Sequence, residues 1–279
     1  LISDWAKENK IKTVLLAHTI DDQVETILMR FSRGSGVDGL VGMKNLIEIH
    51  GISWLRPLLN ITRSDLRKFL KFNKFNWVED PTNEDRKYLR VKSRNIISQL
   101  RKIGINTDLV VNTSVRMKNA KKVLDDVAVE AFNNFITLKK WGDIEVNKDI
   151  FSYCREDTIL RTLAGIIKGI SGSVYRPRYR ELINFAEGLN NKNFKARTLS
   201  GVLARAISQN KIVLRREPSH PICISNLKSK NFIWDGRWHV FLAKPLSKSE
   251  YIGPLGNNGY QQIKNQVEDI KTNECFLST

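Results

Sequence analysis

The feature that most constrains the fold is an apolar run at residues 13–17 that passes, through a short polar turn, into a helix-period pattern. An uninterrupted apolar run is typical of a strand buried on both faces of a parallel sheet. The spacing of Val24, Ile27 and Phe31 predicts that a helix follows. In doubly wound α/β folds, ligands bind at such turns, outside the carboxyl end of the sheet. We therefore expect the polar residues of this turn to belong to a functional site.

Carboxylates gather at the start of the expected helix, which covers residues 22–32. Asp21, Asp22 and Glu25 fall within about one turn, on the side that we expect to face away from the apolar stripe. Such a cluster calls for a cation, which Mg²⁺ bound to nucleotide phosphates or a substrate ammonium would supply. The alternative is that Thr19 and Asp22 form only a capping box at a helix start, which leaves Glu25 unexplained.

The helix is followed by Arg33-Gly34-Ser35-Gly36, within a glycine-rich stretch at residues 34–42 that we expect to be a loop. The arginine would be a fixed cation beside glycines that let the backbone approach a ligand closely. His18 precedes the helix, and no other histidine stands at metal-ligand spacing from it. We therefore expect His18 to tie the turn or to touch a nucleotide, and we expect no zinc.

Two of these segments carry a family resemblance. The letters HTIDDQVET at residues 18–26 and RGSGVDGL at residues 33–40 closely resemble the tRNA(Ile)-lysidine synthetases, in the N-type ATP-pyrophosphatase (PP-loop) superfamily. Four further blocks are similar to later parts of the same family: residues 56–59, 77–83, 234–237 and 253–256. The resemblance implies an α/β fold. Its first domain is an incomplete doubly wound parallel sheet of the adenine nucleotide alpha-hydrolase type, followed by a helical domain and a small β-rich segment.

The resemblance also implies a reaction. In that family, O2 of the wobble cytidine of an isoleucine tRNA attacks the α-phosphate of ATP, pyrophosphate leaves, and the ε-amine of lysine then displaces AMP at C2. The implied cofactors are ATP and Mg²⁺, and the partners are free L-lysine and a tRNA(Ile) with a CAU anticodon, with a homodimer possible. The implied catalytic residues are Asp21, Asp22, Glu25 and Arg33. The implied nucleotide-binding residues are His18, Gly34, Ser35 and Gly36, and the implied metal ligands are Asp22 and Glu25.

One departure from the family concerns the phosphates of ATP. The family opens with a Ser-Gly-Gly-x-Asp-Ser loop whose backbone amides hold them, and no such loop occurs here. We therefore expect a missing N-terminus, weak ATP binding and no lysidine formation by the chain unaided. A non-catalytic RNA-binding remnant is one alternative. A 2-thiocytidine synthetase relative fits poorly, because such enzymes rely on paired cysteines and Cys154, Cys223 and Cys275 are far apart.

Charge points to a polyanionic partner. The 279 residues carry a formal net charge of +17, and such a field attracts nucleic acid without specifying its sequence. The alternative is a lysine-rich surface of no specific use. No apolar run approaches the ~20 residues of a membrane span, and we expect a cytoplasmic protein without a membrane partner. The expected RNA contacts are Arg90, Arg94, Lys118, Lys121 and Lys122, and, in a basic and aromatic loop, Arg176, Arg178 and Tyr179.

The remaining pattern predicts three domains, at residues 1–103, 104–216 and 217–279. In the first we expect a second strand at residues 52–55 and a helix capped by Thr62, with Leu66, Phe69 and Leu70 inward. In the helical, tRNA-binding second domain we expect a long helix whose stripe, from Ala120 to Phe135, is core, and two further helices. From Thr198 onward the pattern changes to short β-like runs, such as residues 211–215 and 238–242, and we expect the third domain to be β-rich. Asp80 fits an Asx-turn or a ligand role equally well.

Overall fold

The computed structural model describes residues 1–49, 51–78, 89–140, 142–173, 175–217, 224–225, 229–234, 238–247 and 250–253. The chain divides into two compact units, Leu1–Val123 and Leu124–Thr279. The helix α6 (Thr107–Phe135) runs through this division. The predicted domain limits at residues 103 and 216 stay predictions.

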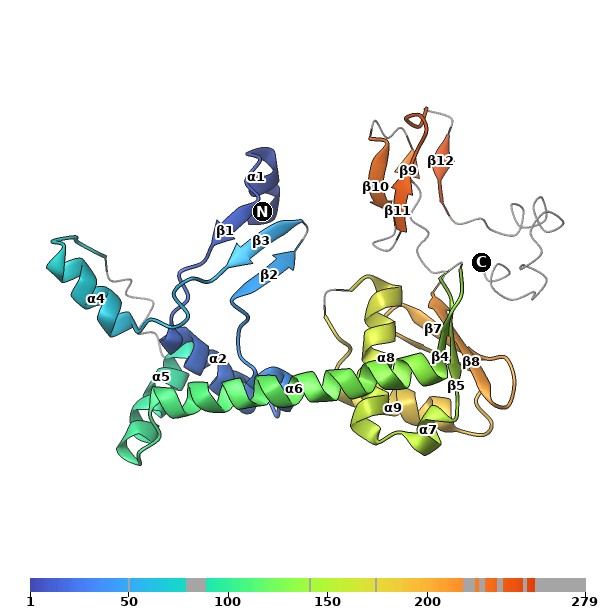
Figure 1. The fold of residues 1–279 in the computed structure, drawn as a ribbon, viewed down its shortest axis with the longest axis horizontal. Coiled ribbons are helices and arrows are strands. Elements are labelled where there is room, and N and C mark those ends of the chain that lie inside the picture. The colour runs from blue at the N-terminus through green and yellow to red at the C-terminus, as the bar shows by residue number, and fades with distance from the viewer. Residues whose placement is uncertain are drawn as a thin grey trace. The chain divides into compact units, whose positions relative to one another are not determined.

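The first unit combines helices with a three-stranded sheet (Figure 1). Its elements are α1 (Ile2–Glu8), β1 (Thr13–Leu15), α2 (Ile20–Phe31), α3 (Val37–Leu40), β2 (Leu46–Ile49), β3 (Ile52–Leu55), α4 (Arg63–Phe72), α5 (Leu89–Lys102) and the first part of α6. The expected strands, the motif helix and the capped helix are confirmed. The strand β2 was not predicted, and the stretch expected to be all loop contains the short helix α3.

The sheet of the first unit has the order β1-β3-β2, with β1 parallel to β3 and β2 antiparallel to it. The parallel pair is the arrangement expected of a doubly wound fold. Burial of β1 on both faces is wrong, however, because Leu15 is 65% exposed. Within the described chain β1 is an edge strand, and its Leu15 face is open.

The helix α4 begins as its sequence predicts, because the side-chain oxygen of Thr62 accepts a hydrogen bond of 3.0 Å from the backbone N–H of Asp65. Leu66 and Leu70 are partly buried, but Phe69 is 60% exposed. The inward orientation expected for Phe69 is therefore wrong. The helical spacing thus predicted the inward orientation of Leu66 and Leu70 correctly.

The second unit contains a larger sheet than the sequence indicated. Its helices and long strands are the end of α6, β4 (Ile136–Leu138), β5 (Ile144–Asn147), α7 (Ile150–Tyr153), α8 (Glu156–Ser171), α9 (Tyr179–Asn190), β6 (Ala196–Leu199), β7 (Val202–Ala206) and β8 (Lys211–Arg216). Short strands follow at β9 (Ile224–Ser225), β10 (Asn231–Trp234), β11 (Trp238–Phe241) and β12 (Tyr251–Ile252). The two predicted helices are α8 and α9, and the short C-terminal strands are also confirmed.

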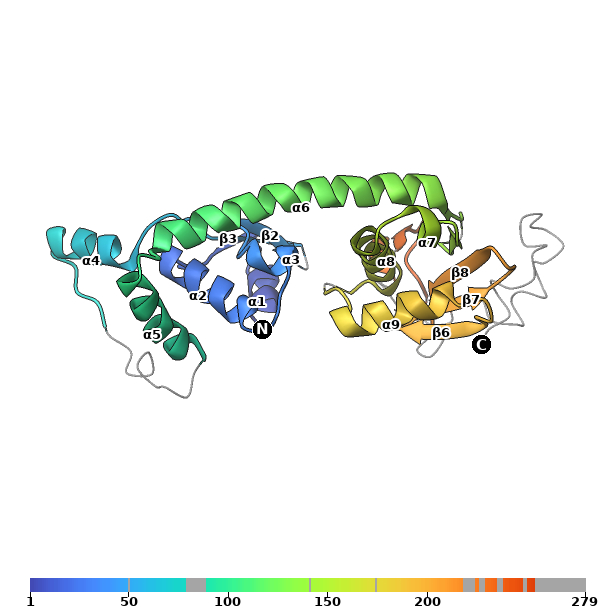
Figure 2. The ribbon, with the colours of Figure 1, turned by 90° about the horizontal axis from the view of Figure 1, so that it is seen from below.

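The core of the second unit lies between a five-stranded antiparallel sheet, in the order β4-β5-β8-β7-β6, and the helices α8 and α9 (Figure 2). Phe185, Leu163 and Ile212 are fully buried there. The region expected to be helical therefore includes most of a sheet. The β-like run predicted at residues 211–215 is confirmed as β8, but β4 and β5 were missed because each is short and partly polar.

The predicted core stripe on α6 is only half correct. Ala128 and Ala131 are buried, at 8% and 4% exposure, but Val123 and Val127 are 62% and 42% exposed. The apolar spacing thus continues beyond the part of the helix that packs on a core. The predicted domain limit at residue 103 falls between α5, which ends at Lys102, and α6, which begins at Thr107.

No helix in the described part of the chain is long and apolar enough to cross a membrane. Several sequence expectations fall on residues outside the described ranges, among them His50, Asp80, Cys223 and Cys275. The described thiol, Cys154, is free, and burial and the nearby Glu130 charge raise its pKa.

Candidate functional site

The site begins where the chain leaves β1 and starts α2. Thr19 is the N-cap of α2, and its side-chain oxygen accepts a hydrogen bond from the backbone N–H of Asp22 at 3.5 Å. In return, the Asp22 Oδ2 atom accepts hydrogen bonds from the backbone N–H and the hydroxyl of Thr19, at 2.8 and 2.7 Å. The capping box that the sequence allowed is therefore present.

Arg63, the first residue of α4, connects that cap to a distant part of the chain. Its backbone N–H donates to Asp21 Oδ2 at 2.7 Å, and its guanidinium donates to Asp22 Oδ1 at 3.0 Å. Burial raises the pKa of Asp22, but the hydrogen bonds from Thr19 and the charges of Arg63 and His18 outweigh that effect. The net pKa of Asp22 therefore lies below its ordinary value, and its carboxylate is held ionised.

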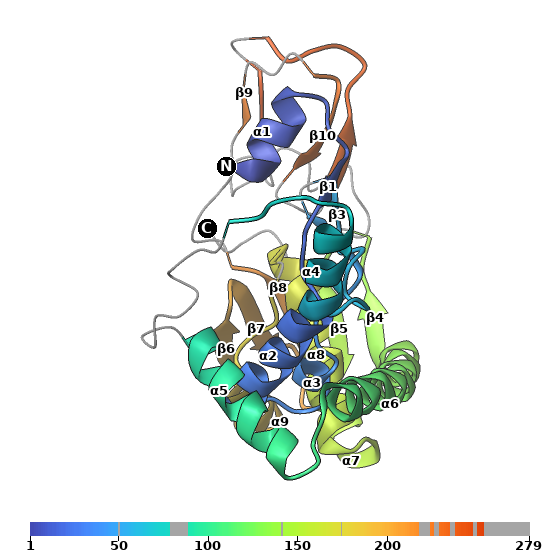
Figure 3. The same ribbon diagram turned by 90° about the vertical axis from the view of Figure 1, so that its left-hand side faces the viewer.

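Glu25 is compensated by a second arginine. The helix α5 lies alongside α2 (Figure 3), and Arg94 on α5 donates from Nε to Glu25 Oε1 at 2.6 Å. The Arg63 guanidinium is 3.8 Å from the same oxygen. Glu25 is 1% exposed, as buried as the core residue Val24, so the expectation that it faces away from the apolar stripe into an open site is wrong. Its Oε2 is buried without a hydrogen-bond partner among the described residues.

The acids do not form a ready metal cage. Both oxygens of Asp22 are already engaged, and Glu25 turns one oxygen to Arg94. No group of three or more His, Cys, Asp or Glu side chains able to hold a metal ion occurs among the described residues. A Mg²⁺ ion held by Asp22 and Glu25 would have to share oxygens that already contact Thr19, Arg63 and Arg94. The assignment of these two residues as metal ligands stays a prediction.

The loop after α2 is built around close backbone approaches. Gly34 adopts a left-handed φ of 71°, and a Cβ on Gly39 would collide with the side chain of Ser35. Arg33 is exposed, and its side chain makes no hydrogen bond or ion pair with any described residue. The loop thus presents one uncommitted cation beside Gly34, Ser35 and Gly36.

Residues 1–100 match the PP-loop domain family, ATP_bind_3. The tRNA(Ile)-lysidine synthase of Wolbachia pipientis wMel is 35% identical to the chain over 257 residues, which is 91% of the chain and 60% of that protein. The tRNA(Ile)-lysidine synthase of Ruegeria pomeroyi is 34% identical over 260 residues, or 93% of the chain and 60% of that protein.

We call residues 1–100 the PP-loop domain, after the family model that they match. The resemblance seen in the motifs is confirmed by these relatives, of whose length the chain spans about 60%. Among solved structures, the U34-tRNA thiolase NcsA from Methanococcus maripaludis matches 41% of the chain and 39% of its own, with a TM-score of 0.34 and 17% identity. That likeness is too weak to bear on fold or function.

The α6 lysines that were expected to contact RNA belong to the first unit, as the PP-loop domain does. Lys118 and Lys122 are exposed. Lys121 is instead partly buried and pairs with Asp38 of the PP-loop domain at 3.2 Å, which gives it a structural contact. Arg94 is likewise bound to Glu25, and the side chain of Arg90 is outside the described part of the structure.

The basic and aromatic loop is in the second unit. Arg176, Arg178 and Tyr179 are all exposed, and Tyr175 and Tyr179 expose 81% and 64% of their surface. Arg178 is the N-cap of α9, but its side chain makes no cap hydrogen bond. The loop therefore has the exposure that contact with bases and phosphates would need.

Sequence reasoning missed three residues that build the site of the PP-loop domain. The side chain of Gln23 accepts a hydrogen bond from the backbone N–H of Met43 at 2.6 Å and donates one to the carbonyl of Met43 at 3.1 Å. Arg30 donates to the carbonyls of Gly39 and Gly42. Arg63 is the third. No local signal marks these side chains, because their partners lie 9 to 42 residues away. The one available clue was that three clustered acids must be neutralised by some cation.

Proposed function

We propose that the chain takes part in the ATP-dependent ligation of lysine to the wobble cytidine of a tRNA(Ile) with a CAU anticodon, through an adenylated cytidine. The observation that carries the proposal is the acid and arginine cluster at the start of α2, in a PP-loop domain within a chain 35% identical over 91% of its length to a tRNA(Ile)-lysidine synthase. The cluster follows β1, and in doubly wound α/β folds ligands bind outside the carboxyl ends of the strands.

The contacts of the three acids suggest that they have different roles. Asp22 and Glu25 are committed to Arg63 and Arg94, so they hold the site together. Asp21 uses one oxygen for the Arg63 backbone N–H, and its other oxygen makes no hydrogen bond or ion pair with a described residue. Asp21 is therefore the carboxylate best placed to receive the ammonium group of lysine.

Arg33 would bind a negatively charged group of a substrate. A guanidinium on a glycine-flanked loop suits a phosphate oxygen of ATP or the carboxylate of lysine, and Arg33 has no competing described partner. Positive charge there would stabilise the negative charge on the oxygens of the pentacoordinate α-phosphorus as O2 of cytidine attacks and pyrophosphate departs. His18, beside Asp22, would contact the nucleotide or keep the turn in place.

The test is incorporation of radiolabelled lysine into a tRNA(Ile) transcript. Because the Ser-Gly-Gly-x-Asp-Ser loop does not occur among these residues, turnover is measured after that loop is supplied by fusion to the corresponding segment of a family member. Replacing Asp21 or Arg33 by Ala is expected to lower incorporation by ~100-fold or more, because each would lose a contact with the reacting groups.

The matched control is Glu48→Ala, at an exposed position of β2, where activity should stay within about two-fold. Near-native turnover by both Asp21→Ala and Arg33→Ala would overturn the roles proposed for these two residues, and no lysine incorporation by the fused parent chain would overturn the proposed ligation. Tight binding of the transcript without any lysine incorporation by the fused protein would favour the alternative, a non-catalytic RNA-binding protein.

A further inference from the structure

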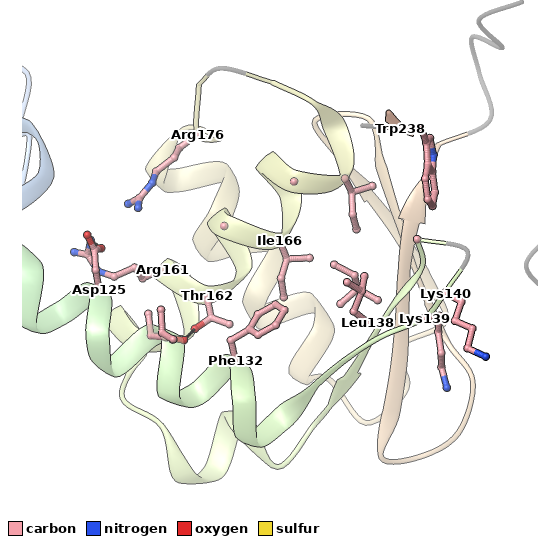
Figure 4. Close-up of a pocket in the computed structure, with 17 residues that line it drawn as sticks. Asp125, Phe132, Leu138, Lys139, Lys140, Arg161, Thr162, Ile166, Arg176 and Trp238 are labelled. Carbon is pink, nitrogen blue, oxygen red and sulfur yellow. Dashed lines mark hydrogen bonds and ion pairs between the residues drawn. The ribbon is translucent and has the colours of Figure 1, made fainter. Parts of the chain in front are cut away.

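The second unit contains a cavity of about 780 Å³ beside α8, with Phe132 in its lining (Figure 4). Two of the cations that line it are paired with acids. Arg161 pairs with Asp125 at 2.9 Å. Lys139 pairs with Glu145, also at 2.9 Å. The lining therefore does not indicate which class of ligand would bind, in contrast to the acids of the first unit.

Asp21, in the first unit, is held by a neutral donor and not by a cation. The carboxylates of Asp22 and Glu25 accept from guanidinium groups, at 3.0 and 2.6 Å. Asp21 Oδ2 accepts instead from the backbone N–H of Arg63, at 2.7 Å. Such a donor orients a carboxylate without cancelling its charge. Asp21 is partly exposed and has no ion-pair partner among the described residues, so its charge stays available to a ligand.

The N–H of Arg63 has a fixed position relative to the start of α2. The backbone N–H of Ile20 donates to the carbonyl of Ile61 at 3.1 Å. The Arg63 guanidinium contacts Asp22, the neighbour of Asp21. Because no residue in the described range of α4 is buried, these polar contacts, rather than apolar packing, set where α4 begins relative to α2. The connection from β3 to α4 thus determines how Asp21 is oriented.

We propose that the backbone N–H of residue 63 positions Asp21 for lysine. It fixes one carboxylate oxygen of Asp21, so that the other oxygen is presented to the ammonium group. Arg63 is a positioning residue, since its N–H acts through Asp21 and does not touch the substrate. The inference rests on the proposed function, in which Asp21 receives lysine. It adds the β3–α4 connection to the parts of the chain that recognise lysine.

Two substitutions at position 63 separate the N–H from the guanidinium. Arg63→Ala removes the side chain and keeps the N–H, whereas Arg63→Pro removes both. Proline is tolerated at the first position of a helix, and Thr62 already has the extended backbone, with φ −77° and ψ 151°, that precedes a proline. The cap hydrogen bond between Asp65 and Thr62 does not involve residue 63, so α4 should begin as before.

The measurement is the dissociation constant of free L-lysine for the fused protein, by NMR titration. Arg63→Pro should bind lysine about 10-fold more weakly than Arg63→Ala, because a hydrogen bond to a charged group is lost. ATP affinity should be equal in the two variants, because Asp21 is assigned to lysine. In an Asp21→Ala background the two variants should bind lysine equally, since the N–H then has no carboxylate to orient. A general loss of structure would not show this dependence on Asp21.

The matched control is Glu156→Pro, which places a proline at the exposed first residue of α8, after the extended Arg155. It should bind lysine within about two-fold of the parent. Circular dichroism checks that each variant is folded. A second test needs no variant: saturating lysine should slow hydrogen exchange of the residue-63 amide by about 5-fold, and ATP alone should not.

Equal lysine affinities of the folded Arg63→Pro and Arg63→Ala variants would overturn the inference, and so would a residue-63 amide whose exchange does not respond to lysine. If lysine binding and incorporation still depend on Asp21, the inference alone fails. If Arg63→Pro shows the expected loss of lysine binding but the fused parent incorporates no lysine into tRNA, the proposed ligation fails and the inference holds. No lysine binding by the fused parent would overturn both.

Discussion

Glu25 is 1% exposed, so its contacts with Arg94 and Arg63 determine whether α2 can pack. A buried ion pair adds little to stability as a whole, because desolvation offsets the attraction between the charges. Removing one partner is a different matter, since it leaves the other charge buried and uncompensated. The same three side chains therefore support the site and make it vulnerable.

Glu25→Ala should destabilise the α2–α5 packing by about 1.5–3 kcal/mol, because the partly exposed Arg94 loses a charge-assisted hydrogen bond and Arg63 loses a nearby opposite charge. The measurement is native-state hydrogen exchange of the backbone amides of α2 and α5. Glu8→Ala, at an exposed position of α1, should change protection by less than about 0.5 kcal/mol. Unchanged protection in Glu25→Ala would show that the pair is not coupled to the packing of these helices.

At the scale of single elements, local chemistry made helices predictable. Thr19 with Asp22 and Thr62 with Asp65 both cap helices that start where the sequence indicated, because a cap involves residues three apart. Burial was harder to predict, since it depends on elements distant in sequence. Leu15, Phe69 and Val127 fit apolar patterns and yet are exposed, and Glu25 reads as polar and yet is buried.

The basic stretch of α6 allows a prediction at this scale. Reversing the exposed Lys118 and Lys122 to Glu should weaken tRNA binding and flatten its dependence on salt, because fewer condensed counterions are released. The measurement is affinity against salt concentration. Lys121 is left out, because its pairing with Asp38 makes any effect structural.

The matched control reverses Lys7 and Lys10, which are also exposed but lie on or just after α1. That double variant should keep the parent slope. Equal slopes in both double variants and the parent would mean that this part of α6 is a solvated face and does not contact RNA.

At the scale of the whole molecule, the two units are stabilised by different sets of contacts. The principal apolar cluster, which includes Phe185, Leu163 and Ile212, belongs entirely to the second unit. The PP-loop domain relies on a smaller set of buried apolar side chains, such as Ala6, Val24 and Ile52, together with the arginine and carboxylate contacts.

The sequence motifs identified the first unit well, because its chemistry is concentrated in short segments. The five-stranded sheet of the second unit depends on long-range pairing between strands, such as β5 with β8, that no local pattern indicates.

Phe185→Ala should therefore destabilise the second unit by about 3–5 kcal/mol, through the cavity left by a side chain that is 1% exposed. Hydrogen exchange should show the loss in α8, α9 and β8, with protection of α2 and α5 unchanged. A parallel loss of protection in α2 would mean that the two units unfold together.

The two contacts of Arg63 are subject to different evolutionary constraints. The hydrogen bond to Asp21 comes from the backbone, so any residue other than proline at position 63 can supply it. The contact with Asp22 comes from the side chain, and it disappears with the charge. Drift at position 63 thus preserves the Asp21 contact by default, whereas Asp22 can be kept only as long as a cation is kept with it. The effects of substitutions at positions 22 and 63 should therefore depend on one another, although 41 residues separate the two positions in the chain.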